Sequence, residues 1–405
     1  MDKLQKLLKY VENNNDFYTN RLKDKNVHCE IDNYPLLSRT ELQNGRYDML
    51  SNSYNGKNFD FLMRRTTSGS SGMPINVYWT PNDFSQSMMT LWRLRRKYYG
   101  IYPNSRQINF TLNYYQVNRK ITELEYTLKD NTLSFSRSSF IGEKDYYKFY
   151  KLINEFQPEW FYIQPFILDK IVDYYMENKY KLPESVRYIE CVGEILTPEV
   201  REKASRYFNI TIANMYGSEE MNGIALECPY NNMHLIEDNI FAECITDNGI
   251  NELGDGEIVI TNLVNHAMPI VRYLQGDIVT IEASKECKCG NKHRIIKVIK
   301  GRKQESFHIN DREITGYVLV EAISAVNNIL GDPIKRYKFT YDSNIKKLSV
   351  KLVIHTSFEK WKNTISQTLQ DILEKEKIEG IEFDIEFVND IYISGEGKYK
   401  ILELI

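Results

Sequence analysis

The most informative stretch of the sequence is RTTSGSSGMP, residues 65–74. Seven of these ten residues are glycine, serine or threonine, and a strand-like run follows at 75–80. Backbone N–H groups and short hydroxyls donate hydrogen bonds to oxyanions, and glycine lets the main chain approach a ligand closely. The composition therefore suits a phosphate-binding loop and a flexible Ser/Gly linker equally well.

This loop differs from the P-loop of nucleotide hydrolases. A P-loop reads G-x-x-x-x-G-K-[ST], and its lysine reaches the phosphates. Here Met73 and Pro74 follow Gly72, where the lysine and the hydroxyl residue would stand. The stretch thus has no cation at that position, so the positive charge must come from another part of the chain.

The overall composition is typical of a soluble globular protein. Of 405 residues, 42% are hydrophobic and 26% are charged, and the formal net charge is −3. This length allows two or three domains, and the mixed charges disfavour a nucleic-acid partner. No apolar run reaches transmembrane length, and the N-terminus is charged from its second residue. We therefore expect a cytoplasmic protein with no membrane partner.

Strand and helix patterns alternate from the N-terminus to about residue 300, which predicts a multi-layer α/β body. Apolar runs predict strands at 160–163, 187–192 and 210–215. Helices are predicted at 145–156, 166–180 and 197–208, the last with Thr197 as N-cap and Pro198 in its first turn. Such units place functional loops at the carboxyl ends of their strands.

From about residue 301 the pattern changes. The predicted elements are a helix, two strands, a helix and a strand, at 316–330, 335–341, 348–354, 358–377 and 381–387. Roughly 100 residues suffice for a separate domain. We therefore predict a large α/β domain at residues 1–300 and a small mobile α+β domain at 301–405.

Three further segments carry residues that suit a nucleotide. Asn214–Glu220 offers an aromatic ring, a glycine turn and two carboxylates, but an ordinary acidic turn has the same residues. Val271–Asp277 ends in an aspartate that either accepts ribose hydroxyls or simply forms a turn. Ser394–Tyr399 contains Lys398, which follows a glycine and carries the charge that the first loop lacks.

Together these segments resemble the adenylate-forming ligases, the superfamily of acyl- and aryl-CoA synthetases, and in particular the phenylacetate–CoA ligases and their capsule-locus relatives. The resemblance runs in order through YPLLSRTEL, TTSGSSGMP, VGEILTPEV, NMYGSEE, MPIVRYLQGD, CKCGNKH and IKGR. It implies the adenylate-forming enzyme fold and a two-step reaction. A carboxylate attacks the α-phosphorus of ATP and releases pyrophosphate; the small domain then rotates, and a thiol attacks the acyl adenylate.

The resemblance also implies the roles of individual residues. The β- and γ-phosphates would be held by Thr67, Ser68, Gly69, Ser70, Ser71 and Gly72. The adenine would lie against Gly193, Glu194 and the turn of Tyr216, Gly217 and Ser218, with the Tyr216 ring stacked on it. Asp277 and Arg302 would hold the ribose, Glu220 would bind Mg²⁺, and Lys398 would contact the α-phosphate. Lys398 and Glu220 are then the catalytic residues.

The sequence departs from the family pattern at three places. Glu219 replaces a hydroxyl residue before Glu220, so a carboxylate there either repels the α-phosphate or joins the metal shell. Lys303 and Gln304 replace an acidic hinge, and residues 308–313 replace a glycine-bearing loop. The last two departures concern the domain rotation and the path of the thiol rather than adenylation.

The six cysteines are scattered, which in a large chain favours thiols or a metal site over disulfides. Three sulfurs and one nitrogen suit tetrahedral Zn²⁺, and Cys228, His234, Cys287 and Cys289 supply that set. Cys228-x5-His234 is not a standard zinc spacing, so the fold must bring the two pairs together. Free thiols are the alternative, and His293 is an alternative ligand.

We interpret the chain as an AMP-forming ligase of an aryl or acyl carboxylic acid that uses ATP, Mg²⁺ and CoA. One alternative is a stand-alone adenylation enzyme that loads the phosphopantetheine of a carrier protein. Another is a degenerate homologue that binds a nucleotide without catalysis. Family members often form dimers, so a homodimer stays open.

Overall fold

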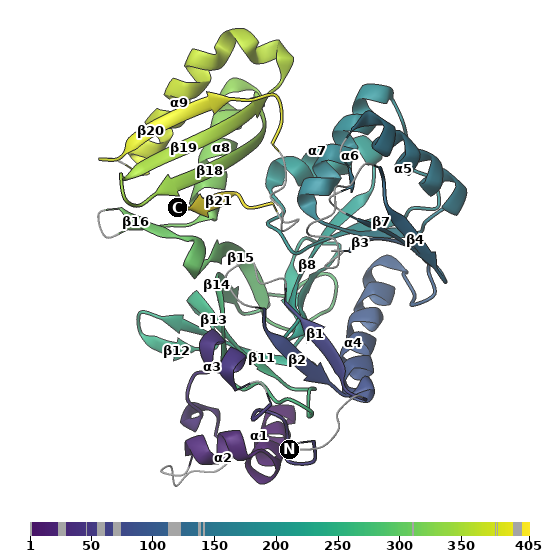
Figure 1. Ribbon diagram of the computed structural model, residues 1–405, viewed down its shortest axis with the longest axis vertical. Coiled ribbons are helices and arrows are strands. Elements are labelled where there is room, and N and C mark those ends of the chain that lie inside the picture. The colour runs from purple at the N-terminus through teal and green to yellow at the C-terminus, as the bar shows by residue number, and fades with distance from the viewer. Residues whose placement is uncertain are drawn as a thin grey trace.

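The computed structural model describes residues 2–22, 30–45, 47–54, 61–67, 74–111, 123–136, 139–140, 142–309, 312–376, 378, 380–391 and 399–405. A 13-stranded sheet runs through the body, and a four-stranded sheet lies in the C-terminal part (Figure 1). The predicted α/β class is confirmed. Among the described residues, no helix combines the length and the hydropathy needed to cross a membrane.

The large sheet is parallel on one side and antiparallel on the other. In spatial order its strands are β12 (Gly249–Asn251), β11 (Ile240–Thr246), β13 (Gly254–Asn262), β14 (Tyr273–Glu282), β15 (Ile295–Arg302), β10 (Met233–Leu235), β9 (Asn222–Glu227), β8 (Thr211–Ser218), β7 (Tyr188–Val192), β6 (Trp160–Ile163), β3 (Gln107–Thr111), β5 (Thr132–Ser136) and β4 (Tyr126–Lys129). Neighbours from β8 to β5 pair in parallel, and β9 begins the antiparallel side. The predicted strands correspond to β6, β7 and the first part of β8.

Four helices accompany the sheet: α4 (Pro81–Tyr99), α5 (Glu143–Phe156), α6 (Pro165–Asn178) and α7 (Pro198–Phe208). The predicted start of α7 is confirmed, because the Thr197 side chain accepts a hydrogen bond from the backbone of Val200 and Pro198 is in the first turn. Thr80 caps α4 in the same way, and Gly100 ends it with a φ of 66°. These helices bury their apolar faces against the parallel strands.

The N-terminal region packs on the antiparallel side, at the end of the molecule opposite the C-terminal part (Figure 1). It contains α1 (Lys3–Asn14), α2 (Asp16–Leu22), η1 (Ile31–Asn33), α3 (Arg39–Asn44), β1 (Met63–Thr66) and β2 (Asn76–Trp79). β1 and β2 form a separate antiparallel pair. Just beyond them, Thr67 N donates to Ile75 O and Ile75 N donates to Thr67 Oγ1, both at 2.9 Å. Thr67 and Ile75 are thus held together on either side of residues 68–73.

Residues 303–405, here called the C-terminal part, have a hydrophobic core of their own. Their elements are η4 (Lys303–Glu305), β16 (Phe307–Ile309), β17 (Arg312–Ile314), α8 (Gly316–Leu330), β18 (Ile334–Asp342), β19 (Lys347–Ile354), η5 (Thr356–Trp361), α9 (Lys362–Lys375), β20 (Glu382–Phe387) and β21 (Leu402–Leu404). The sheet order is β20-β19-β18-β21. The helix predicted at 358–377 begins later, because η5 occupies residues 356–361, and β21 was not predicted.

The C-terminal part contacts α6 and α7 mainly through charged side chains. We call this group the α6 ion-pair cluster; it consists of Asp169, Lys170, Asp173, Lys203, Lys335, Arg336 and Asp390. Arg336 of β18 contacts both aspartates of α6, with Nε 2.5 Å from Asp169 Oδ2. Lys203 of α7 pairs with the same two aspartates. Two helices of the body are thus joined to β18 and to residue 390.

A buried ion pair joins α4 to β7. Arg95 Nε donates to Glu190 Oε2 at 2.9 Å, and its guanidinium carbon lies 4.6 and 4.8 Å from the ring centroids of Trp92 and Trp160. The Glu190 side chain is 0% exposed. Because a buried carboxylate without its cation is strongly disfavoured, this pair fixes the position of α4 on the sheet.

We expect Arg95→Met to lower the unfolding free energy by roughly 3–5 kcal/mol, because it leaves Glu190 buried without its cation. Urea denaturation measures this loss. Arg93→Met is the matched control: Arg93 lies on the same helix, is 66% exposed and pairs with Asp238. That change should lower stability by less than about 1 kcal/mol. Similar losses in the two variants would contradict the role assigned to the buried pair.

Candidate active site

A cavity of about 400 Å³ opens where the large sheet meets the C-terminal part. Its walls are formed by residues 193–198 after β7, Arg201 on α7, 214–217 on β8, Glu227, Asn231 and Met233 from β9 to β10, Gln275 and Asp277 on β14, 296–299 with 301–302 on β15, Glu305 in η4, and 316, 317, 320 and 399–402 in the C-terminal part. The β7 and β8 segments lie at the carboxyl ends of parallel strands, where α/β sheets bind ligands. The cavity is therefore the candidate active site.

Glu194 connects the two sides of this cavity. It follows Gly193, whose φ of 75° favours glycine and turns the chain at the end of β7. Glu194 Oε2 accepts a hydrogen bond from Phe166 N at 3.2 Å, and Oε1 accepts one from Tyr399 N at 3.0 Å. The Tyr399 ring also stacks on Phe166, with centroids 4.6 Å apart. One carboxylate thus holds the start of α6 and the C-terminal segment together.

A polar group made of Tyr216, Asp277 and Arg302 also lines the cavity. The Tyr216 hydroxyl donates to Asp277 Oδ2 at 2.5 Å, and Arg302 Nε lies 3.6 Å from Asp277 Oδ1. Burial raises the pKa of Asp277, while Arg302 and the Tyr216 hydroxyl oppose the rise. Burial and the neighbouring Asp277 raise the pKa of Tyr216 well above its usual value. The tyrosine therefore stays protonated and donates to the carboxylate.

The turn after Tyr216 is closely packed. A side chain at Gly217 would come within 2.4 Å of the Asn222 carbonyl oxygen, so only glycine fits there. The Ser218 hydroxyl donates to Gln275 Oε1 at 3.4 Å. Glu220 is 2% exposed, and its Oε1 accepts a hydrogen bond from the Tyr273 hydroxyl at 3.3 Å. Glu220 is thus held in place beside the cavity rather than on its wall.

Comparison with known proteins identifies the family of this chain. A family model described as "AMP-binding enzyme" matches residues 30–240, a little over half of the chain. The chain belongs to the AMP-binding enzyme family. This confirms the resemblance to the adenylate-forming enzymes and accounts for a site at the ends of β7 and β8.

Two curated relatives agree with the family. Protein CapK of Staphylococcus aureus is 24% identical over 98% of this chain and 87% of its own length. Phenylacetate-coenzyme A ligase of Thermus thermophilus is 27% identical over 38% of this chain and 36% of its own.

Solved structures show the same fold. 2-Hydroxyisobutyryl-CoA ligase in its postadenylation state has a TM-score of 0.76 with 16% identity, over 99% of this chain and 87% of that chain. The same enzyme in its thioesterification state has a TM-score of 0.60, over 99% and 88% of the two chains. Both comparisons show that the chain has the fold of this ligase.

Six of the nine predicted nucleotide contacts that the structure describes line the cavity. Its walls include Gly193, Glu194, Tyr216, Gly217, Asp277 and Arg302. Ser218 and Glu220 lie directly behind Gly217, and Thr67 is held at the end of β1. Ser68, Gly69, Ser70, Ser71, Gly72 and Lys398 lie outside the described residues. The individual roles of all these residues stay predictions.

Sequence reasoning missed several residues of the cavity walls, among them Asn214, Glu227, Gln275, Tyr317 and Lys400. Glu227 is the clearest case. Its Oε2 accepts hydrogen bonds from Asn214 N at 2.7 Å and from Arg201 Nη2 at 2.9 Å, so it holds β8 to α7. The sequence does not reveal this role, because the two partners belong to other elements, β8 and α7.

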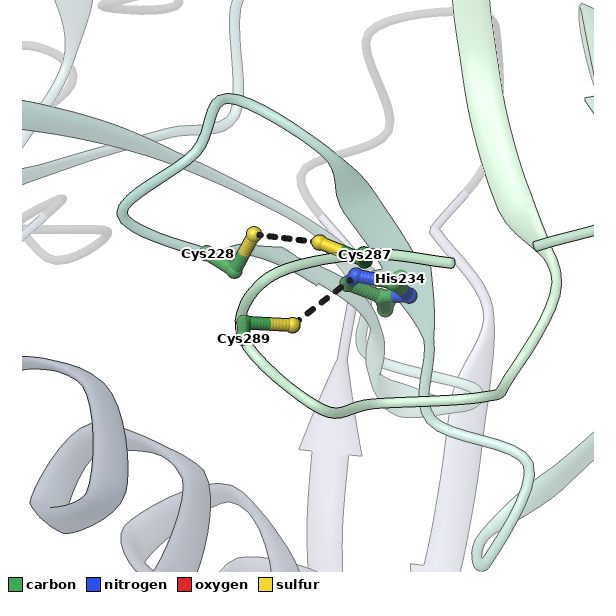
Figure 2. A group of neighbouring side chains, drawn as sticks. All are labelled: Cys228, His234, Cys287 and Cys289. Carbon is green, nitrogen blue, oxygen red and sulfur yellow. Dashed lines mark hydrogen bonds between the residues drawn. The ribbon is translucent and has the colours of Figure 1, made fainter. Parts of the chain in front are cut away.

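A second group of side chains lies behind this wall (Figure 2). It brings together Cys228, next to Glu227, His234 of β10, and two cysteines between β14 and β15, Cys287 and Cys289. Their ligand atoms all lie within 4.8 Å of one another. Cys228 and Cys287 Sγ are 3.7 Å apart, and Cys289 Sγ is 3.3 Å from His234 Nε2. We call these four residues the Cys₃His group.

The histidine of the Cys₃His group has a defined orientation. His234 Nδ1 lies 3.0 Å from the His293 carbonyl oxygen, which only accepts hydrogen bonds, so Nδ1 carries the proton. Nε2 then faces the sulfurs with a free lone pair, as in metal-binding histidines. His293, the alternative ligand, instead directs its Nδ1 at the Leu235 carbonyl oxygen at 3.1 Å.

We expect Glu194→Ala to loosen the contact between the C-terminal segment and the body. A hydrogen bond to a charged acceptor contributes roughly 1.5–3 kcal/mol, so exchange of the Tyr399 amide should quicken by about tenfold or more. Hydrogen–deuterium exchange of a peptide covering 399–405 measures this. Glu202→Ala, at an exposed site on α7, is the control. Unchanged exchange in the Glu194 variant would rule out the connecting role.

Proposed function

We propose that the protein is an AMP-forming ligase that activates a carboxylic acid with ATP and transfers the acyl group to CoA. The observation that carries this proposal is the cavity that Tyr216, Asp277 and Arg302 line together with Glu194 and Tyr399, in a chain of the AMP-binding enzyme family. The names of two similar proteins, a phenylacetate-coenzyme A ligase and a 2-hydroxyisobutyryl-CoA ligase, support CoA as the acceptor.

In the proposed first step, a carboxylate oxygen of the acid bonds to the α-phosphorus of ATP, and the bond from that phosphorus to pyrophosphate breaks. Asp277 accepts the ribose hydroxyls, and Arg302 keeps its carboxylate charged. The Tyr216 ring lies against the adenine, and Thr67 to Gly72 hold the outer phosphates. Lys398 contacts the α-phosphate, where negative charge develops in the transition state and a placed cation is most effective.

A Mg²⁺ ion held by Glu220 and the phosphates would neutralise charge on the leaving pyrophosphate. Mg²⁺ at phosphate-transfer sites is commonly bound by one or two carboxylates together with the substrate's phosphates. Glu220 suits this role, because the Tyr273 hydroxyl fixes one oxygen of its carboxylate. The metal would bind to the second oxygen.

We further propose two domains, residues 1–300 and 301–405, whose relative orientation changes between the two steps. Two observations support this: the separate core of the C-terminal part, and the higher similarity to a postadenylation state than to a thioesterification state. In the second step, the CoA sulfur bonds to the acyl carbon and AMP leaves. The altered hinge at Lys303 and Gln304 lies in η4, where the two parts join.

Exchange of radioactive pyrophosphate into ATP tests the first step. The protein should catalyse exchange in the presence of one or more acids from a panel of aromatic and aliphatic carboxylic acids. Lys398→Ala should lower the exchange rate by about 10²-fold or more, the loss typical of one transition-state charge contact. Lys360→Ala, an exposed lysine in η5, is the control and should keep full exchange.

The outcomes separate the candidate functions. ATP binding without exchange for any acid would contradict a ligase and favour a degenerate nucleotide-binding homologue. Exchange followed by an acyl-CoA product, detected by mass spectrometry, supports the proposal. Exchange with acyl transfer only to a carrier protein would contradict CoA as the acceptor.

We also propose that the Cys₃His group binds one structural Zn²⁺. Two sulfurs bound to one zinc at about 2.3 Å lie roughly 3.8 Å apart, and Cys228 and Cys287 Sγ are 3.7 Å apart. The donor set and the orientation of His234 also suit this metal. Cys228 and His234 adjoin Glu227 and Met233, which line the cavity, so the metal would fix that wall.

Metal analysis of the purified protein should give about one zinc per chain, and His234→Gln should lower that content severely and lower the melting temperature. His293→Gln is the matched control and should keep the zinc, because His293 faces the Leu235 carbonyl. Well under one zinc per chain in the unaltered protein would overturn the metal site, and loss of zinc only in the His293 variant would overturn the ligand assignment.

A further inference from the structure

Two adjacent carboxylates, Glu219 and Glu220, lie next to the cavity where the triphosphate of ATP is proposed to bind. Glu220 is buried and held by Tyr273, but the Glu219 side chain is 36% exposed. Gly217, two residues earlier, is part of the cavity wall. A carboxylate without a compensating charge at this place would repel a polyanion. Glu219 therefore needs a cation.

Arg65 supplies that cation. Arg65 Nε donates to Glu219 Oε2 at 2.7 Å, and Nη2 lies 2.7 Å from the same oxygen. The guanidinium also lies over the Phe84 ring, 5.5 Å from its centroid. Because arginine keeps its charge at every physiological pH, the compensation does not depend on protonation.

The position of Arg65 connects this ion pair to the phosphate-binding stretch. Arg65 is the third residue of β1, two residues before Thr67, whose backbone and hydroxyl are bonded to Ile75. Glu219 directly follows β8, which carries Tyr216. The ion pair is thus a direct link between the strand that leads into residues 68–73 and the strand that carries the adenine-binding turn.

We propose that Arg65 is a positioning residue for the triphosphate: it neutralises Glu219, holds that carboxylate away from the phosphates and fixes β1 to the end of β8. The proposal rests on the proposed function and deepens it. It names an ion pair that affects the binding of the nucleotide's phosphates and not the binding of its adenosine. An exposed ion pair with no such role contributes little to stability and nothing to ligand choice.

Calorimetric titrations with Mg²⁺–ATP and with adenosine test this proposal in four proteins: the unaltered chain, Arg65→Gln, Glu219→Gln and the double variant. Arg65→Gln should weaken Mg²⁺–ATP binding by roughly tenfold, the order expected for one uncompensated like charge at a solvent-accessible site. Adenosine binding should stay within about twofold, which also shows that the variant is folded. The double variant should regain Mg²⁺–ATP affinity to within about threefold, because no carboxylate then needs compensation.

Arg64→Gln is the matched control. Arg64 is exposed, precedes Arg65 on β1 and points to the other face of that strand, yet its loss changes the net charge by the same amount. Its affinity for both ligands should match that of the unaltered chain within about twofold. An equal loss in the Arg64 and Arg65 variants would mean that total charge matters rather than the ion pair, and would overturn the proposal.

Three other outcomes would also overturn it. Unchanged Mg²⁺–ATP affinity in Arg65→Gln would make the pair a surface contact only. A double variant as weak as Arg65→Gln would mean that Arg65 acts on the phosphates directly, independently of Glu219. If the unaltered chain binds neither ligand, the proposed function is wrong and this inference is wrong with it. If the unaltered chain binds both ligands and the variants have no effect, only this inference is wrong.

Discussion

The antiparallel pairing of β14 with β15 is the constraint on which the rest of the structure depends. Its register places Asp277 opposite Arg302. At Arg302 the chain leaves the large sheet for the C-terminal part. A slip of one residue would turn one of the two side chains to the other face of the sheet. Gly276 and Gly301, with φ values of 83° and 108°, flank the pair and allow the turns that this arrangement needs. One strand pair thus sets both the Asp277–Arg302 side of the cavity and the exit of the chain.

The site is assembled from residues that are held in place before any ligand arrives. Tyr216 and Arg302 fix Asp277, Tyr273 fixes Glu220, and the amides of Phe166 and Tyr399 fix Glu194. Such preorganised groups lose little conformational freedom on binding and keep their fields directed at the ligand. Fixed side chains suit the proposed two-step reaction at a single site. In that reaction the nucleotide contacts persist while the attacking group changes from the carboxylate to the thiol.

The sequence predicted those parts of the site that depend on local chemistry. Glycine turns, the cap at Thr197 and the donor types of the cysteines are visible in a few residues, and they led to the β7 and β8 ends and to the Cys₃His group. The remaining features depend on pairing between distant segments. Arg65 meets Glu219 across 154 positions, and β21 is recognisable only beside β18. Glu227 was missed because its partners, Asn214 and Arg201, belong to other elements.

The α6 ion-pair cluster gives the C-terminal part a particular kind of attachment. Its contacts with α6 and α7 include the stacked rings of Phe166 and Tyr399 and the ion pairs of this cluster, whose charges water hydrates and dissolved salt screens once they separate. Because the C-terminal part is joined to the body through η4, its contact with α6 and α7 is an intramolecular one. Higher ionic strength weakens the ion pairs between the C-terminal part and α6 and α7. The covalent connection at η4 keeps the two surfaces near one another. The rotation proposed above would separate these ion pairs, so its free energy would depend on the ionic strength of the surrounding solution.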